Sequence, residues 1–453
     1  MRNACCICAA GILINRLADN QIGDALFFFA VKLHRYYRNC RIFVVSVIYT
    51  KMKAFRLFCI LASAVTLFMA CTDDSSETPS DITKPEEQPQ ERPVIEGMFL
   101  GGDISVLQSY EDNKVPYYDV QGNKIADVLK YMKSEEVGWN AQRVRLFVDP
   151  KRVNPDGGAD AQVCQDIDYV VRLCKRIKDE GFALMLDFHY SDTWADPSNQ
   201  WIPAAWASLN ETELWNKVYD YTKECLQRLV DAGAAPDFIQ PGNEISYGML
   251  WSVDVNRNSR VNRCYSDSPA ENWNRFIGFL QQASKACREV CPKAGIIIHT
   301  ERSGDPKALK DIYSRLSCVD YDIIGLSYYP IWHNSLSVLS QSLELLAEEF
   351  PDRKVQIVET AYHYQWQPPL GQGTIYDFSS QWPVSPEGQA AFAEDLIKEL
   401  KKHPNVNGLY WWFPEENGNG PDCSVLTGWV NRGLWDNESH RALPALYVLK
   451  DFI

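Results

Sequence analysis

The sequence predicts one α/β domain folded as a (β/α)8 TIM barrel, in which eight parallel strands close into a barrel and helices surround it. Three observations point to this fold. Short apolar runs alternate with amphipathic segments from residue 94 to residue 453, which is typical of strand-helix units. Eight such runs follow one another without interruption, which favours a closed barrel over an open sheet. The chain of 453 residues also has room for a barrel of about 250 residues or more with extensions.

The eight apolar runs are short enough to be strands that are buried on both faces. They span residues 98–103, 141–148, 182–189, 237–246, 295–299, 321–329, 355–359 and 408–412. Helices are predicted near residues 125–133, 161–180, 211–231, 269–289 and 443–452. The second of these helices keeps apolar residues at helical spacing and stops at Gly181, because glycine is favoured just after a helix end.

The composition restricts the kind of partner. Hydrophobic residues make up 46% of the chain, enough for a large core, and the net charge is -14. Nucleic acids and anionic membrane surfaces require basic patches, so neither is expected as the main partner. A neutral polysaccharide raises no such conflict. The 14 Trp and 22 Tyr residues agree with this, because flat aromatic faces stack on sugar rings, although most of them fill the core.

The N-terminal region contains a signal for export. Residues 1–51 show no periodicity that would build a domain, and we interpret them as upstream sequence, with Met52 as the true start. Lys53 and Arg56 form a positive region, and residues 57–70 form an apolar stretch that is too short to span a membrane.

Cys71 follows this apolar stretch, and Met69-Ala70-Cys71 resembles a bacterial lipoprotein cleavage site. We therefore predict a signal peptide over residues 52–71 with a lipid on Cys71. Residues 72–93 are acidic and rich in proline and predict a flexible tether. The expected protein is an exported, monomeric lipoprotein at the outer membrane and the cell surface. Its only contact with the membrane would be the lipid anchor.

Polar or aromatic residues end every predicted strand, where barrels place their chemistry. These residues are Asp103, Arg143, Arg145, Asp187, His189, Asn243, Glu244, His299, Tyr328, Tyr329, Glu359, Trp411 and Trp412. Any one of them could be structural, but together they indicate a site. Two carboxylates at strand ends are the minimum for cleaving a glycosidic bond.

Glu244 is the expected general acid/base and Glu359 the expected nucleophile. Asn243 would bind the sugar hydroxyl next to the reacting carbon. Arg145 would keep Glu359 ionised, because an adjacent guanidinium lowers the pKa of a carboxyl, and a tyrosine after the sixth strand could donate to it as well.

Several motifs resemble glycoside hydrolase family 53, the arabinogalactan endo-β-1,4-galactanases. They are GGDIS (101–105), YYDVQG (117–122), DFHYSDTWADP (187–197), PAAW (203–206), GNEISYGMLW (242–251), IGLSYYPIWH (324–333), VETAY (358–362) and SPEGQAAF (385–392). The resemblance covers the chain from about residue 99 to its end. It implies a (β/α)8 barrel that cleaves β-1,4-galactan with retention of configuration, using Glu244 as acid/base and Glu359 as nucleophile.

The same resemblance implies a sugar cleft lined by residues of three motifs. They are His189, Asp192, Trp194, Trp332, His333 and Trp412. Asp103, Arg145, Asn243, His299, Tyr328 and Tyr329 are the further substrate-binding candidates, taken from the strand ends. No cofactor is expected.

The last loop, residues 414–433, looks particular to this chain. Some relatives hold a structural calcium ion in their last loops. Glu416, Asn417 and Asp422 could supply oxygens, but their spacing does not match a known calcium loop, so a solvated loop is the preferred interpretation.

Two other functions remain open. Another hydrolase with the same two glutamates, such as a β-mannanase or a cellulase, would share the chemistry but lack DFHYSDTWADP. A glycan-binding lipoprotein without activity would not need both carboxylates and an intact Arg145.

Overall fold

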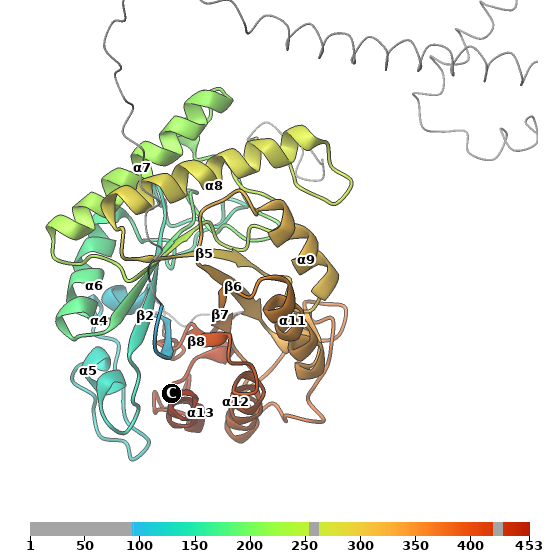
Figure 1. Ribbon diagram of the computed structural model, residues 1–453. Helices are drawn as coiled ribbons and strands as arrows, with labels where there is room; N and C mark the ends of the chain where they lie inside the picture. The colour runs from blue at the N-terminus through green and yellow to red at the C-terminus, as the bar shows by residue number, and fades with distance from the viewer. Residues whose placement is uncertain (1–92, 94, 253–261, 420–428) are drawn as a thin grey trace, which may run out of the picture. The chain divides into compact units, whose positions relative to one another are not determined.

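The computed structural model describes residues 93, 95–252, 262–419 and 429–453. Within this range eight parallel strands close into a barrel in the order β1 to β8, and helices surround it (Figure 1). The predicted (β/α)8 barrel is confirmed. The predicted signal peptide, Cys71, almost all of the tether and Asp422 lie outside the described residues.

The strand ends lie within two residues of the predicted runs, except that β4 ends five residues earlier than predicted. Their bounds are β1 Phe99–Asp103, β2 Ala141–Leu146, β3 Ala183–Phe188, β4 Phe238–Pro241, β5 Gly295–Thr300, β6 Ile323–Tyr328, β7 Lys354–Thr360 and β8 Val406–Trp412. The fourth strand is shorter than predicted because the chain turns sharply after Pro241. Gly242 has φ +100° there and Glu244 has φ +49°, which no strand residue adopts.

The larger helices lie between consecutive strands. They are α6 Ile167–Asp179, α7 Glu211–Asp231, α8 Ala270–Val290, α9 Pro306–Arg315, α11 Leu336–Glu349 and α12 Pro386–Leu400. Shorter helical segments are α4 Leu107–Asp112, α5 Val128–Lys133, η1 Ala204–Trp206, α10 Pro330–His333, η2 Trp429–Arg432, α13 Pro444–Val448 and η3 Leu449–Phe452. Helix α6 begins six residues later than predicted because Asp166 caps it, accepting from the Tyr169 amide. The predicted closing helix is two short pieces, α13 and η3.

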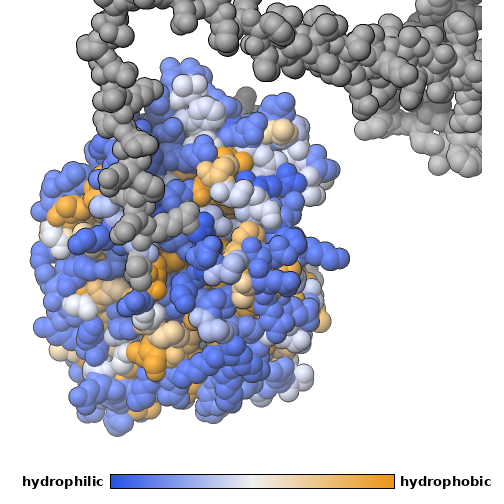
Figure 2. Space-filling view, viewed as in Figure 1, coloured by the Kyte–Doolittle hydropathy of each residue, from blue (hydrophilic) through white to orange (hydrophobic). Residues whose placement is uncertain are grey.

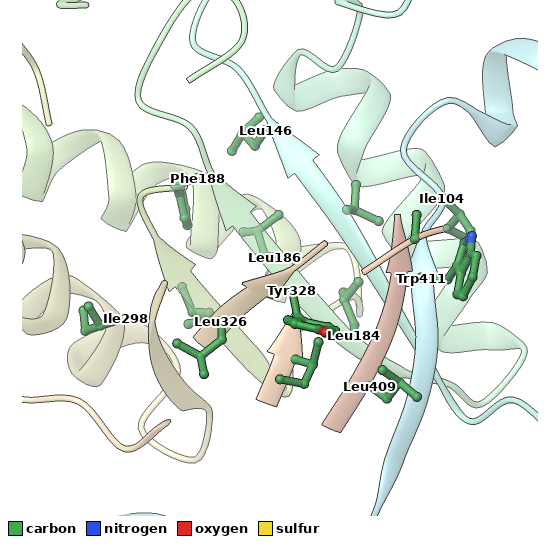
Figure 3. Close-up of a cluster of buried hydrophobic side chains, with 14 of the residues drawn as sticks. Ile104, Leu146, Leu184, Leu186, Phe188, Ile298, Leu326, Tyr328, Leu409 and Trp411 are labelled. Carbon is green, nitrogen blue, oxygen red and sulfur yellow. The ribbon is translucent and has the colours of Figure 1, made fainter. Parts of the chain in front are cut away.

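Two apolar layers build the core, one on each face of the strands. The outer layer fills the space between the barrel and the helices. Figure 3 shows three of its members, Leu184, Leu186 and Phe188, which are every second residue of β3. The inner layer plugs the barrel near the amino ends of the strands. Its members are Ala141, Met185, Phe238, Ile297, Ile323, Val358 and Tyr410. The strands read as continuous apolar runs because both of their faces are buried.

The surface of the helices is polar. On the face in Figure 2, apolar residues are scattered among hydrophilic ones. In the described part of the chain, no helix combines the length and the apolar character needed to cross a membrane. Cys287 and Cys291 are buried in the outer layer, where they are core positions.

The β1–β2 contact depends on a glycine. A Cβ atom at Gly101 would lie 2.1 Å from the Ala141 carbonyl oxygen. We expect Gly101→Ala to lower the free energy of unfolding by about 1–3 kcal/mol, because overpacking forces the two strands apart. Urea unfolding would measure this. At the exposed Gly158, the nearest atoms belong to the Asn154 side chain, so Gly158→Ala is the control and should change stability by less than about 0.5 kcal/mol. An equal loss in both variants would contradict the packing argument.

Candidate active site

A cavity of about 820 Å³ lies at the carboxyl ends of the strands. Both glutamates proposed for catalysis line it, together with Arg145, His189, Trp194, Asn243, Tyr329, Trp332, His333 and Trp412. The structure therefore brings ten of the residues that were predicted from strand ends and motifs into one cavity. This is the edge where barrel enzymes carry out their chemistry.

Glu244 enters the cavity from the turn after β4. Its left-handed backbone is unusual for a residue with a side chain, and such strain is concentrated at functional sites. Ser327 Oγ on β6 donates to Glu244 Oε1 at 2.6 Å. The neighbouring Asn243 donates from Nδ2 to the Ala195 carbonyl oxygen at 2.8 Å, and the second hydrogen of that amide is available to a ligand.

His299 on β5 contacts the Ser327 hydroxyl from the interior of the barrel. Its Nε2 lies 2.8 Å from Ser327 Oγ, and its Nδ1 lies 3.3 Å from the Glu244 amide nitrogen and 3.1 Å from Gln240 Nε2. Burial lowers the pKa of His299 well below its usual range, so the ring is neutral. Asn243 Oδ1 lies 3.0 Å from Nδ1 but already accepts from Arg143. Because two N–H groups face Nδ1, we assign the proton to Nε2, which donates to Ser327, and Ser327 in turn donates to Glu244.

Glu359 is aimed into the cavity by an irregularity in β7. The register between β6 and β7 shifts at Leu326/Ser327, so that Ile357 pairs with Leu326 but Glu359 pairs with Ser327. Bulges of this kind redirect side chains and are common beside active sites. Tyr329 then donates its hydroxyl to Glu359 Oε2 at 2.9 Å. A tyrosine donor after the sixth strand was expected, and Tyr329 holds that place.

The cation beside Glu359 is Arg143, whereas the sequence predicted Arg145. Arg143 Nη2 lies 3.0 Å from Glu359 Oε1, 2.8 Å from Asp187 Oδ2 and 2.8 Å from Asn243 Oδ1. Its Nη1 lies 2.8 Å from Asp103 Oδ2. Both arginines point into the barrel, but Arg143 lies one pleat deeper and reaches its centre, whereas Arg145 lies nearer the rim.

Arg145 instead packs against Trp194 and Trp412, two aromatic residues that line the cavity. Its Nη1 bonds Asp103 Oδ1 at 2.8 Å, and its guanidinium carbon lies 4.7 Å from the centre of the Trp194 ring and 5.8 Å from that of Trp412. Trp194 is also fixed by its indole nitrogen, which donates to Asp160 Oδ2 at 2.8 Å. The arrangement holds two flat apolar surfaces at the cavity beside the carboxylates.

The two glutamates differ in their electrostatic surroundings. Burial, and next the charge of Glu359, raises the pKa of Glu244 well above its usual range. Burial raises the pKa of Glu359 to about 7, while Arg143 and the Tyr329 hydroxyl act in the opposite direction. Glu359 therefore loses its proton first, and Glu244 keeps one.

Four predicted binding residues do not line the cavity. Asp103 and His299 lie beneath it, fully buried among the polar groups that fill the barrel at that level. Tyr328 points the other way, into the outer layer, where its hydroxyl donates to the Asn334 carbonyl oxygen. Successive residues of a strand face opposite sides, so only one of the two adjacent tyrosines can face the cavity. Asp192 accepts from the Ala204 amide in a loop.

Sequence reasoning missed other parts of the cavity. Glu301 follows β5, lines the cavity and accepts from Ser246 Oγ. The strand-end rule would have found it if the fifth strand had been extended by two residues. Residues 195–199, after β3, also contribute to the lining, and so do five residues after β2: Asn154, Pro155, Asp156, Asp160 and Gln162. They lie far along loops where no periodicity marks them.

The last loop is not solvated where it is described. Residues 414–418 are buried, which corrects that interpretation. The Asn417 amide donates to the Pro116 carbonyl oxygen, and Glu416 accepts from Tyr110 and Gln162. Glu416 Oε1 and the Asn417 side-chain nitrogen are therefore engaged within the protein. Over the described ranges, no cluster of three or more His, Cys, Asp or Glu residues suited to a metal ion occurs.

Comparison with known proteins agrees with this geometry. A chain named "Ignisphaera aggregans GH53 catalytic domain" superimposes with a TM-score of 0.66 at 30% identity, covering 83% of this chain and 99% of that one. The arabinogalactan endo-beta-1,4-galactanase of Thermothelomyces thermophilus is 30% identical and covers 78% of this chain and 98% of its own. The endo-beta-1,4-galactanase of Bacillus subtilis is 29% identical, over 76% of each chain. The model of glycosyl hydrolase family 53 matches residues 99–449, and the chain belongs to that family.

Proposed function

We propose that this protein is a retaining endo-β-1,4-galactanase that cleaves pectic galactan or type I arabinogalactan. One observation carries the chemistry: Glu244 and Glu359 line one cavity in surroundings that separate their proton affinities. The names of the Thermothelomyces and Bacillus relatives support galactan as the substrate.

In the first step, Glu359 attacks the anomeric carbon of the sugar bound beside it. Arg143 and Tyr329 contact its carboxylate and hold it in position for the attack. Glu244 gives its proton to the glycosidic oxygen, so that the remainder of the polymer leaves as an alcohol. The product is a sugar esterified to Glu359.

The ester also changes Glu244. The charge of Glu359 raises the pKa of Glu244 in the free enzyme, and the ester removes that charge. The pKa of Glu244 falls, which suits its second task of taking a proton from water. Water then attacks the anomeric carbon, Glu359 is released, and the sugar regains its original configuration.

A β-mannanase or cellulase would use the same two glutamates, and a silent glycan-binding protein would keep the fold without the chemistry. The paired carboxylates with Arg143 and Tyr329 in contact with Glu359 favour an active enzyme. The motifs around Asp187–Pro197 and the galactanase relatives favour galactan.

We further propose that Cys71 carries a lipid and that the acidic segment after it tethers the catalytic domain, as a monomer, to the outer membrane at the cell surface. The apolar stretch over residues 57–70 and the Met69-Ala70-Cys71 sequence support this.

The central experiment compares linear β-1,4-galactan with mannan and cellulose. We expect reducing ends to appear from galactan alone, with internal cuts that shorten the polymer early, and with products that NMR first detects as β anomers. Glu359→Ala should lower the turnover by at least about 10³-fold, because no ester can form, while the bound oligosaccharide is retained. Near-normal turnover of Glu359→Ala would contradict the nucleophile assignment. Cleavage of mannan or cellulose instead of galactan would contradict the substrate.

The pH profile of kcat/KM should be bell-shaped. Activity needs Glu359 ionised, so it falls as the pH drops through about 7, and it needs Glu244 protonated, so it falls again at high pH. Tyr329→Phe removes a donor that favours the ionised Glu359, which raises that pKa and moves the acid limb to higher pH. Ser327→Ala removes a donor that favours the ionised Glu244, so it raises the pKa of Glu244 and moves the alkaline limb to higher pH. If Tyr329→Phe moved only the alkaline limb, the two roles would have to be exchanged.

The lipid proposal is tested in bacterial cells that are fed labelled palmitate. The wild-type chain should take up the label and fractionate with membranes, and Cys71→Ser should do neither, because the proposed attachment site of the lipid is lost. Cys318→Ser, at an exposed position of the barrel domain, is the control and should keep the label. A labelled Cys71→Ser protein would overturn the anchor.

A further inference from the structure

Apolar side chains are exposed mainly on one loop. Six large apolar side chains are exposed in the described ranges, and four of them lie on the loop between β7 and α12. Trp366 is 41% exposed, Leu370 58%, Ile375 66% and Tyr376 37%. Exposed apolar side chains that gather in one place mark binding surfaces more often than scattered ones do.

The loop is held in a fixed shape against the cavity. The amides of Ile375 and Tyr376 donate to the Ile331 carbonyl oxygen at 2.9 and 3.0 Å, and Trp332 Nε1 donates to the Gly373 carbonyl oxygen at 2.9 Å. Trp332 and Ile375 themselves line the cavity. The exposed side chains therefore continue the cavity wall onto the surface.

The chemistry of the loop selects the kind of ligand. Residues 366–376 read WQPPLGQGTIY and contain no charged residue, in a chain of which 23% is charged. A nucleic acid or an anionic membrane needs cations, which this segment lacks. Aromatic rings and side-chain amides without charge suit neutral sugar rings, which offer apolar faces and hydroxyls.

We propose that this loop binds sugar units of the polysaccharide that lie beyond those held at the two glutamates. The inference rests on the proposed function, since the same chain of sugars would occupy both places. Trp366 and Tyr376 supply stacking surfaces, and the exposed Gln372 supplies hydrogen bonds. Such contacts form before the reaction and persist through it, so they strengthen binding of a long substrate without changing the chemical step.

The test uses Trp366→Ala and Tyr376→Ala in the full chain, with linear β-1,4-galactan and galactotetraose as substrates. Neither residue lines the cavity, and both are exposed, so both variants should fold. We expect KM for galactan to rise about 5- to 10-fold at unchanged kcat, and kcat/KM for galactotetraose to stay within about 2-fold. Val120→Ala is the control, because Val120 is 44% exposed on a turn outside the cavity lining. Val120→Ala should leave KM and kcat/KM unchanged for both substrates.

Binding is measured separately in the inactive Glu359→Ala background, by retardation in gels that contain galactan. Adding Trp366→Ala should reduce the retardation, and adding Val120→Ala should not. Equal losses on galactan and galactotetraose, or no loss on either, would overturn the loop proposal while leaving the proposed function intact. A wild-type protein that released no reducing ends from galactan would overturn the proposed function instead.

Discussion

The guanidinium of Arg143 is the contact on which the mouth of the barrel depends. It is fully buried and lies within 3.0 Å of oxygens from Asp103, Asp187, Asn243 and Glu359, so it joins four strands or strand ends around the barrel. Burial alone would lower the pKa of Arg143, but the carboxylates of Asp187, Glu359 and Asp103 hold it above its usual value. Removing one partner from such a buried ion pair costs about 3–5 kcal/mol, so its geometry is tightly constrained.

Two hydroxyl groups at the carboxyl end of β6 each contact one of the two glutamates. Ser327 and Tyr329 are two residues apart and both face the cavity side, where one hydroxyl contacts Glu244 and the other contacts Glu359. What differs is the second contact. Glu359 also contacts a cation, whereas Glu244 has the neutral His299 behind its serine. Two carboxyl groups in one cavity therefore hold their protons with different strength, which is the condition for one to act as acid while the other attacks.

The apolar runs were sufficient to predict the barrel and to place Glu244 and Glu359 at its mouth, because a buried parallel strand leaves an unmistakable pattern and its carboxyl end is known. The pattern does not show how deep a side chain lies, and so Arg145 was chosen where Arg143 holds the position. It also does not reveal the bulge in β7 or the facing of Tyr328 and Tyr329. The burial of Glu416 and Asn417 could not be predicted because their partners, such as Tyr110, are some 300 positions away in the chain.

The Trp194 indole donates to Asp160 and packs on the Arg145 guanidinium. Arg145 and Arg143 both bind Asp103, and Arg143 also binds Glu359. A surface loop and the reacting carboxylate thus share one continuous set of contacts. A substitution of Trp194 or Asp160 that is meant to admit branched chains would therefore also change the charged surroundings of Glu359. Selectivity and rate in this scaffold are best altered together, with the loop aspartate and its tryptophan exchanged as one unit.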